Sequence, residues 1–155
     1  MRISAKADYA VRAMVHLATA AAADRSGPTK GETIATAQAI PGKFLETILS
    51  DLRHAGLVRS QRGAEGGYWI DRPAAEVSVA DVIRAVDGPL ATVRGQRPEE
   101  VAYTDDLRAL QRTWIALRHN LRAVLETVTL ADLAAGDLPD AVDRLAEDPE
   151  AWTTR

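Results

Sequence analysis

The chain of 155 residues has no cysteine, few aromatic residues and no long apolar run. The lack of cysteine excludes disulfides, zinc ribbons, thiol catalysis and all-cysteine iron–sulfur sites. No apolar run approaches the roughly 18 residues that a membrane span needs, so we expect no membrane segment. The first residues lead directly into an amphipathic helix, unlike a signal peptide, and we therefore expect a cytoplasmic protein.

Enzyme patterns are also missing from the sequence. His16, His54 and His119 lie far apart and form no metal-ligand spacing. There is no phosphate-binding loop, no dinucleotide-binding fingerprint, and no catalytic triad or carboxylate pair on a shared loop. We therefore predict that the protein is not an enzyme and has no metal site.

Charge is distributed unevenly along the chain. Residues 1–72 contain ten Lys and Arg against seven Asp and Glu, whereas residues 73–155 contain nine against fifteen. The first part is therefore basic, although the net charge of the whole chain is −3. Because a protein that is acidic overall can bind DNA through one basic face, this asymmetry makes the first part a candidate for nucleic-acid binding.

The basic part is predicted to contain three helices. Apolar residues at helical spacing predict the first over residues 3–22, followed by a loop over residues 24–28. Thr29 and Glu32 have the spacing of a capping box, so the second helix is expected to begin at Thr29. Pro41 is expected at the first position of the third helix. The two apolar stripes consist of Ile3, Ala7, Ala10, Met14 and Leu17, and of Phe44, Leu45, Ile48, Leu49 and Leu52.

A glycine-rich hairpin is predicted directly after the third helix. Residues 57–58 and 68–70 are expected to form two short strands, and the glycines between them permit a tight turn. Arg59 and Arg62 lie on this hairpin. Two short helices joined by a turn are equally typical of a helical hairpin, but a following hairpin with two arginines favours a winged helix-turn-helix that reaches DNA.

A long helix with a heptad pattern is predicted in the acidic part. A short helix beginning at Ser78 or Val79 comes first, and residues 89–104 are expected to form a loop. The apolar positions of the long helix recur every three and four residues, which is typical of a dimerisation helix. A long helix buried in its own domain remains the alternative. The predicted dimer-interface residues are Leu107, Leu110, Trp114, Leu117, Leu121, Val124 and Val128.

Four segments resemble the Rrf2 family of bacterial transcription regulators, which includes IscR-, NsrR- and CymR-like proteins. Residues 52–68 resemble the wing and residues 1–14 the first helix of that family. Residues 78–87 resemble the helix after the wing, and residues 129–133 the end of the dimer helix. The resemblance implies a homodimer on a pseudo-palindromic DNA operator, with the third helix in the major groove and the wing in the minor groove.

The resemblance places candidate DNA-binding residues on the third helix and the wing. They are Gly42, Lys43, Glu46, Thr47, Ser50, Arg53, Arg59, Arg62, Gly63, Gly66, Gly67 and Tyr68. A lysine can read guanine acceptors and a glutamate can accept from the cytosine amino group, so Lys43 and Glu46 are candidates for base contacts. Ser50 and Arg53 are expected to meet phosphates, which position a protein without specifying sequence. For each helix position, a solvated surface is the alternative.

The chain departs from the family at the cofactor. Sensor members hold an iron–sulfur cluster through cysteines in the loop after the fourth helix, and residues 90–104 contain no thiol. Asp8 lies where some relatives have a carboxylate ligand, but one carboxylate cannot hold a cluster. We therefore expect no cofactor and a cluster-free branch of the family. Trp69 and Trp114 are expected either in the core or, less readily, in a pocket for a small-molecule effector.

The sequence thus predicts a mainly α-helical fold with a small β-hairpin wing and a long dimerisation helix. We expect a winged helix-turn-helix domain over residues 1–88, a loop over 89–104, a dimerisation region over 105–135 and an acidic tail over 136–155. The predicted function is that of a dimeric regulator, a repressor, that binds double-stranded DNA. The alternative is a winged-helix module that acts through a partner protein, and acidic neighbours that neutralise the basic surface would favour it.

Overall fold

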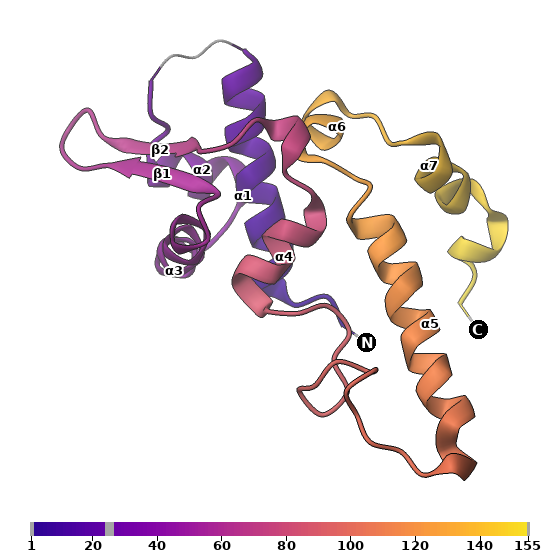
Figure 1. The fold of residues 1–155 in the computed structure, drawn as a ribbon. Coiled ribbons are helices and arrows are strands. Elements are labelled where there is room, and N and C mark those ends of the chain that lie inside the picture. The colour runs from indigo at the N-terminus through magenta and orange to yellow at the C-terminus, as the bar shows by residue number, and fades with distance from the viewer. Residues whose placement is uncertain (1, 24–26, 155) are drawn as a thin grey trace.

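The structure is a computed structural model that describes residues 2–23 and 27–154. A winged helical domain lies on one side, and a long helix stands beside it (Figure 1). In chain order the elements are α1 (Ala5–Ala22), α2 (Gly31–Gln38), α3 (Gly42–His54), β1 (Val58–Gln61), β2 (Gly67–Ile70), η1 (Ala74–Glu76), α4 (Val79–Asp87), η2 (Asp105–Leu107), α5 (Arg108–Leu125), α6 (Leu130–Ala135), α7 (Asp140–Glu147) and η3 (Pro149–Trp152). None of the helices in the described ranges is long and apolar enough to cross a membrane.

Helix α1 is the centre of the hydrophobic core. The hydroxyl of Ser4 accepts a hydrogen bond from the Ala7 amide at 2.9 Å and caps the helix, because it satisfies a backbone donor that no helical carbonyl can reach. Small buried alanines along α1 allow α3, α4 and α6 to pack closely around it. The predicted stripe is buried except for Ile3, which is 75% exposed because it precedes the helix. The helix therefore begins two residues later than predicted.

The start of α2 corrects the predicted capping box. The helix begins at Gly31 after Lys30, and no side chain caps it. Thr29 lies outside the helix because its backbone pairs with Tyr68 of β2. Residues 24–26 of the predicted loop lie outside the described residues.

The turn between α2 and α3 is tight and uses a left-handed residue. Ala39 ends α2 with φ 51° and ψ 46°, a conformation that a β-carbon disfavours. The guanidinium of Arg12 on α1 donates to the carbonyl of Gln38, which ties this turn to the core. Pro41 was predicted at the first position of the third helix, but its ψ of 129° is not helical, so it is the N-cap residue and α3 begins at Gly42. Leu45, Ile48, Leu49 and Leu52 of α3 are buried as predicted. Phe44 is 36% exposed and contacts the ring of Tyr9 edge-on, with centroids 5.6 Å apart.

Strands β1 and β2 form the predicted antiparallel hairpin, with Arg59 opposite Trp69. The hairpin can close because Gly66 has no side chain. A β-carbon at Gly66 would lie 2.2 Å from the carbonyl oxygen of Gln61. The strands are longer than predicted and extend toward the tip, to Gln61 and Gly67.

Helices α4 and α6 each begin with a capping box. Ser78 and Asp81 satisfy each other's backbone groups at the start of α4, as Thr129 and Asp132 do at α6. The Val79 amide donates to the Val128 carbonyl at 2.9 Å, so the two starts lie side by side. This pairing shows that the predicted heptad seam was wrong at its last residue, Val128. Helix α5 stops at Leu125, and Val128 is only 5% exposed within its own chain.

Helix α5 has no fully buried residue. It is joined to the winged domain by residues 89–104, which contain no helix or strand, as predicted. Pro98 and Val101 of this loop are buried, and the Gln111 amide donates to both of their carbonyls at 3.2 and 3.0 Å. The loop is therefore held against α5. Helix α7 follows Pro139 in the acidic tail.

Candidate nucleic-acid interface

The outer face of α3 is polar and accessible. Because one side of this amphipathic helix is buried against α1 and α4, the opposite side faces solvent. Lys43, Glu46, Thr47 and Arg53 are exposed, and Ser50 is half-buried. Gly42 begins the helix, and a β-carbon there would meet nothing within 4 Å. The structure therefore brings the predicted helix residues to one open surface.

Ser50 contacts His54 one turn along α3, where the Ser50 carbonyl lies 2.7 Å from Nδ1 of the imidazole. Thr47 donates to the Lys43 carbonyl at 3.4 Å, and Arg53 donates to the Ser60 hydroxyl at 3.4 Å. The contact of Arg53 with Ser60 joins α3 to β1 and sets the wing beside the helix. Figure 1 shows the hairpin and α3 on the same side of the molecule, away from α5.

The two wing arginines have different surroundings. Arg59 forms an ion pair with Asp71 at 2.9 Å, and its guanidinium lies 5.9 Å from the centre of the Trp69 ring. Arg62 is exposed near the tip and forms no ion pair with any residue that the structure describes. Asp71 was not predicted as a partner, because it follows β2 and approaches Arg59 only when the hairpin closes. Arg62 is therefore the wing cation that remains available to an anion.

The wing glycines and Tyr68 shape the hairpin and hold it against the domain. Gly63 has φ 103°, and its carbonyl accepts from the Gly66 amide at 2.9 Å, which shapes the tip. Gly66 is buried. Gly67 lies so close to the Thr29 backbone that a β-carbon would be 2.5 Å from its carbonyl oxygen. Tyr68 packs against the core.

Among the described residues, an acidic neighbour pairs with only one of the four basic residues of this surface, Arg59. Asp51 forms its ion pair with Lys6 of α1, at 2.7 Å. Within the described ranges, Glu46 and Glu65 form no ion pair, and Lys43 and Arg53 form none either. The condition that would have favoured a protein-binding module is met only at Arg59, by Asp71.

The predicted dimer residues differ in their exposure. Leu107, Leu110 and Leu117 are 44%, 37% and 40% exposed, as is the neighbouring Ile115 at 41%, which the heptad pattern missed. Leu121 and Val124 are half-buried and line an apolar groove of about 640 Å³ between the start of α1, α4 and α5. Val128 is buried within its own chain, where its carbonyl accepts a hydrogen bond from the Val79 amide.

The two tryptophans that were considered for one pocket lie apart. Trp114 lines a cavity of about 490 Å³ between α5 and residues 89–98. Trp69 is on the wing beside Arg59. Both rings are half-buried. A shared pocket between them is therefore ruled out.

The residues present do not fit an iron–sulfur cluster. The chain has no cysteine, and within residues 2–23 and 27–154 no three His, Asp or Glu side chains gather as metal ligands. Asp8 instead forms an ion pair with Arg12, one turn along α1, at 3.3 Å. A thiolate-held cluster therefore has no ligands here.

A helix-turn-helix followed by a hairpin wing defines the winged-helix class of DNA-binding proteins. Residues 3–136 match the model of the Rrf2 family, described as iron-dependent transcriptional regulators, and the chain belongs to this family. The protein is thus a DNA-binding transcription regulator of the helix-turn-helix type.

Relatives with regulator names cover nearly the whole chain. The Mycobacterium tuberculosis protein Rv1287, a candidate HTH-type transcriptional regulator, is 53% identical over 152 residues, which is 97% of this chain and 92% of the relative. The HTH-type transcriptional regulator CymR of Bacillus subtilis is 36% identical over 135 residues, which is 87% of this chain and 91% of CymR. The names of these relatives agree with the prediction that the protein is not an enzyme.

Solved structures confirm the predicted fold. The structure of CymR (YrzC), the global cysteine regulator of B. subtilis, gives a TM-score of 0.73 at 33% identity and covers 89% of this chain and 99% of that chain. The structure of T. potens IscR gives 0.67 at 29% identity and covers 100% of this chain and 93% of that chain.

Proposed function

We propose that the protein is a homodimeric repressor that occupies a pseudo-palindromic operator. The observation that carries this proposal is the shared open surface of α3 and the wing, on which Lys43, Arg53 and Arg62 have no acidic partner among the described residues. Three uncompensated cations on one surface attract a polyanion such as the DNA backbone.

Helix α3 is the proposed recognition helix. Gly42, Lys43, Glu46 and Thr47 lie toward its N-terminal end, the end that reaches base edges in helix-turn-helix proteins. Lys43 would read guanine acceptors, and Glu46 would accept from a cytosine amino group. Ser50 and Arg53 would contact phosphates and set the position of the helix.

The wing is proposed to enter the adjacent minor groove through Arg62. A narrow minor groove has a strong negative potential, which favours an arginine side chain. Arg59 would contribute less free charge, because Asp71 already pairs with it. The glycines and Tyr68 would hold the shape of the hairpin and bring Arg62 to its groove.

The dimer is proposed to form through α5. Leu107, the N-cap residue of α5, and Leu110 and Leu117 within this helix expose apolar side chains, and a second copy would remove them from water. A two-fold dimer presents two copies of α3, so it would read two half-sites in a palindromic arrangement. Repression would follow from occupation of promoter DNA.

Selection of bound DNA from a random-sequence pool tests the proposal. We expect the purified chain to enrich an inverted repeat, with half-sites separated by about one helical turn, roughly 34 Å, or a multiple of it. Enrichment of a single half-site would contradict the dimeric mode. Failure to enrich any sequence would contradict operator recognition as a whole.

A further inference from the structure

Four arginines from three segments of the chain line one cavity of about 520 Å³. Arg84 comes from α4, Arg97 from the loop, and Arg118 and Arg122 from α5. Glu99 is the acidic residue in the lining. Cavities of a few hundred Å³ are the size that holds small ligands. The lining comes from α4, the loop that follows it and α5, and no residue of α3 contributes to it.

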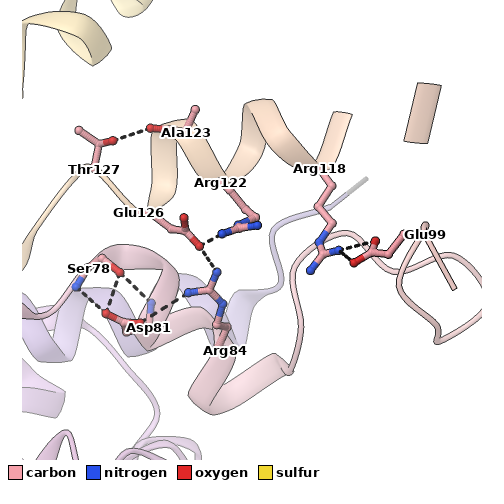
Figure 2. Close-up of polar contacts among 9 residues, drawn as sticks. All are labelled: Ser78, Asp81, Arg84, Glu99, Arg118, Arg122, Ala123, Glu126 and Thr127. Atoms are coloured by element: carbon pink, nitrogen blue, oxygen red, sulfur yellow. Dashed lines mark hydrogen bonds and ion pairs between the residues drawn. The ribbon is translucent and has the colours of Figure 1, made fainter. Parts of the chain in front are cut away.

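The guanidinium groups in this cavity already bind carboxylates of the protein itself. Arg118 donates to both carboxylate oxygens of Glu99, each at 2.6 Å. Glu126 accepts from Arg122 at 2.9 Å and also from Arg84. Figure 2 shows Arg84 and Arg122 converging on Glu126, and Arg118 facing Glu99. The site therefore presents guanidinium groups in positions that suit carboxylate groups.

These contacts lower the pKa of both glutamates. The hydrogen bond from Arg118 is the main cause for Glu99, and those from Arg122 and then Arg84 are the main causes for Glu126. Both side chains are thus held as carboxylates. The same arrangement favours the ionised form of any carboxylic acid that enters.

The remaining ion pairs at the cavity are longer. Arg97 lies 3.9 Å from Glu100, and Arg84 lies 3.6 Å from Asp81. The Arg97 side chain is 59% exposed and donates no hydrogen bond to the described residues. Each arginine has five N–H donors, so most donors in the cluster are still available. Asp81, Glu99, Glu100 and Glu126 match the four arginines in charge, so the cluster gains a net positive charge for a ligand only where one of these carboxylates moves away.

Glu99 is the carboxylate that can leave. It belongs to the loop, its side chain is 47% exposed, and Arg118 is its hydrogen-bonding partner. Glu126 is held by two arginines and lies on α5 itself. We propose that this cavity is a binding site for a small di- or tricarboxylate, one carboxylate of which replaces Glu99 on Arg118 while another reaches Arg97 or Arg122.

Titration calorimetry of the full-length protein with citrate, at constant ionic strength and without DNA, tests this site. We expect saturable binding of one citrate per chain. Arg97→Ala should weaken binding by about threefold and Arg118→Gln by about tenfold or more, as lost charge-assisted contacts imply. Glu99→Gln should tighten binding by about threefold, because the competing carboxylate is gone.

Controls separate a site from a general effect of anions or of misfolding. Arg112→Ala removes a cation from α5 outside the cavity and should leave citrate binding unchanged. Arg97→Ala lies in an exposed loop position, so it keeps the test valid if Arg118→Gln unfolds. Absence of saturable binding, or equal binding by sulfate, would overturn the proposal. Wild-type affinity in both single variants, Arg97→Ala and Glu99→Gln, would overturn it as well. Because DNA is absent, these results do not depend on the proposed operator binding.

Discussion

Thr29 and Tyr68 exchange two backbone hydrogen bonds. The Thr29 amide donates to the Tyr68 carbonyl at 3.0 Å, and the Tyr68 amide donates to the Thr29 carbonyl at 2.8 Å. The residue before α2 therefore pairs with the second wing strand, although the two residues are far apart in sequence. This pairing anchors the wing to the helix-turn-helix and makes the region around Gly67 intolerant of a side chain.

Gly67→Ala is expected to destabilise the fold. Its β-carbon would lie 2.5 Å from the Thr29 carbonyl oxygen, so the Thr29–Tyr68 pair must separate. We expect the free energy of unfolding to fall by about 2 kcal/mol or more. Gly42→Ala is the control, because its β-carbon meets nothing within 4 Å and Gly42 is the first residue of α3, so stability should change by less than about 0.5 kcal/mol. Equal urea midpoints for both variants would contradict the crowding at Gly67.

Arg62→Ala is expected to weaken binding to the selected DNA. Because Arg62 has no ion-pair partner among the described residues, its whole charge is available to the minor groove. We expect affinity to fall by about three- to tenfold and the slope of log K against log salt to shrink by about one. Fluorescence anisotropy over a salt series measures both. Arg144→Ala on α7 should change neither quantity, and an unchanged slope in Arg62→Ala would exclude the wing from the interface.

Leu110→Asp is expected to weaken the dimer without unfolding the chain. Leu110 is 37% exposed on α5, so a charge there costs little in the monomer but opposes burial against a second copy. Sedimentation equilibrium should show a dimer dissociation constant raised by about tenfold or more. Leu145→Asp, at a position on α7 that is 59% exposed, serves as the control. If Leu110→Asp dimerises as the parent does, α5 is not the interface.

Asp132→Asn is expected to lower stability at neutral pH and to matter less in acid. Hydrogen bonds from the Thr129 hydroxyl and then the Thr129 amide lower the pKa of Asp132 below its ordinary value of 3.8. Such a carboxyl stabilises the fold above pH 3.8, and that contribution is lost as pH falls through the lowered value.

Thermal unfolding between pH 7 and pH 2.5 measures this effect. At pH 7 the variant should lose about 1 kcal/mol, as for other helix caps. The difference from the parent should shrink below pH 3.8. Asp137→Asn, just beyond the same helix, is the matched control and should follow the parent. A difference that stays constant with pH would contradict the role given to the Asp132 charge.

Local patterns in the sequence were sufficient for most elements. Ser78 starts α4 and Gly63 shapes the wing tip, both as predicted, because capping and left-handed turns depend on a few adjacent residues. The order of helices, hairpin and long helix followed from hydrophobic periodicity. The exposed face of α3 followed from the same pattern, since its apolar side has to be buried.

Contacts between distant segments were decided by the tertiary structure alone. The capping box predicted at Thr29 was wrong because a strand far along the chain takes up the Thr29 backbone. The heptad pattern ran on to Val128, but α5 ends earlier because the Val128 carbonyl pairs with the start of α4. Periodicity describes one segment in isolation. It cannot predict a backbone hydrogen bond to a segment that is distant in sequence.

The functional surfaces divide in the same way. The sequence placed Arg59 and Arg62 together on a basic hairpin, since both belong to one short stretch of the chain. Only the folded chain distinguishes them, because Asp71 reaches Arg59 and leaves Arg62 without a partner among the described residues. Likewise, Arg84 and Arg118 lie 34 positions apart and line one cavity only because α4 and α5 pack side by side. Charge and periodicity can be read from short stretches of sequence. The residues that come to lie beside a charge depend on how distant segments pack in the folded chain.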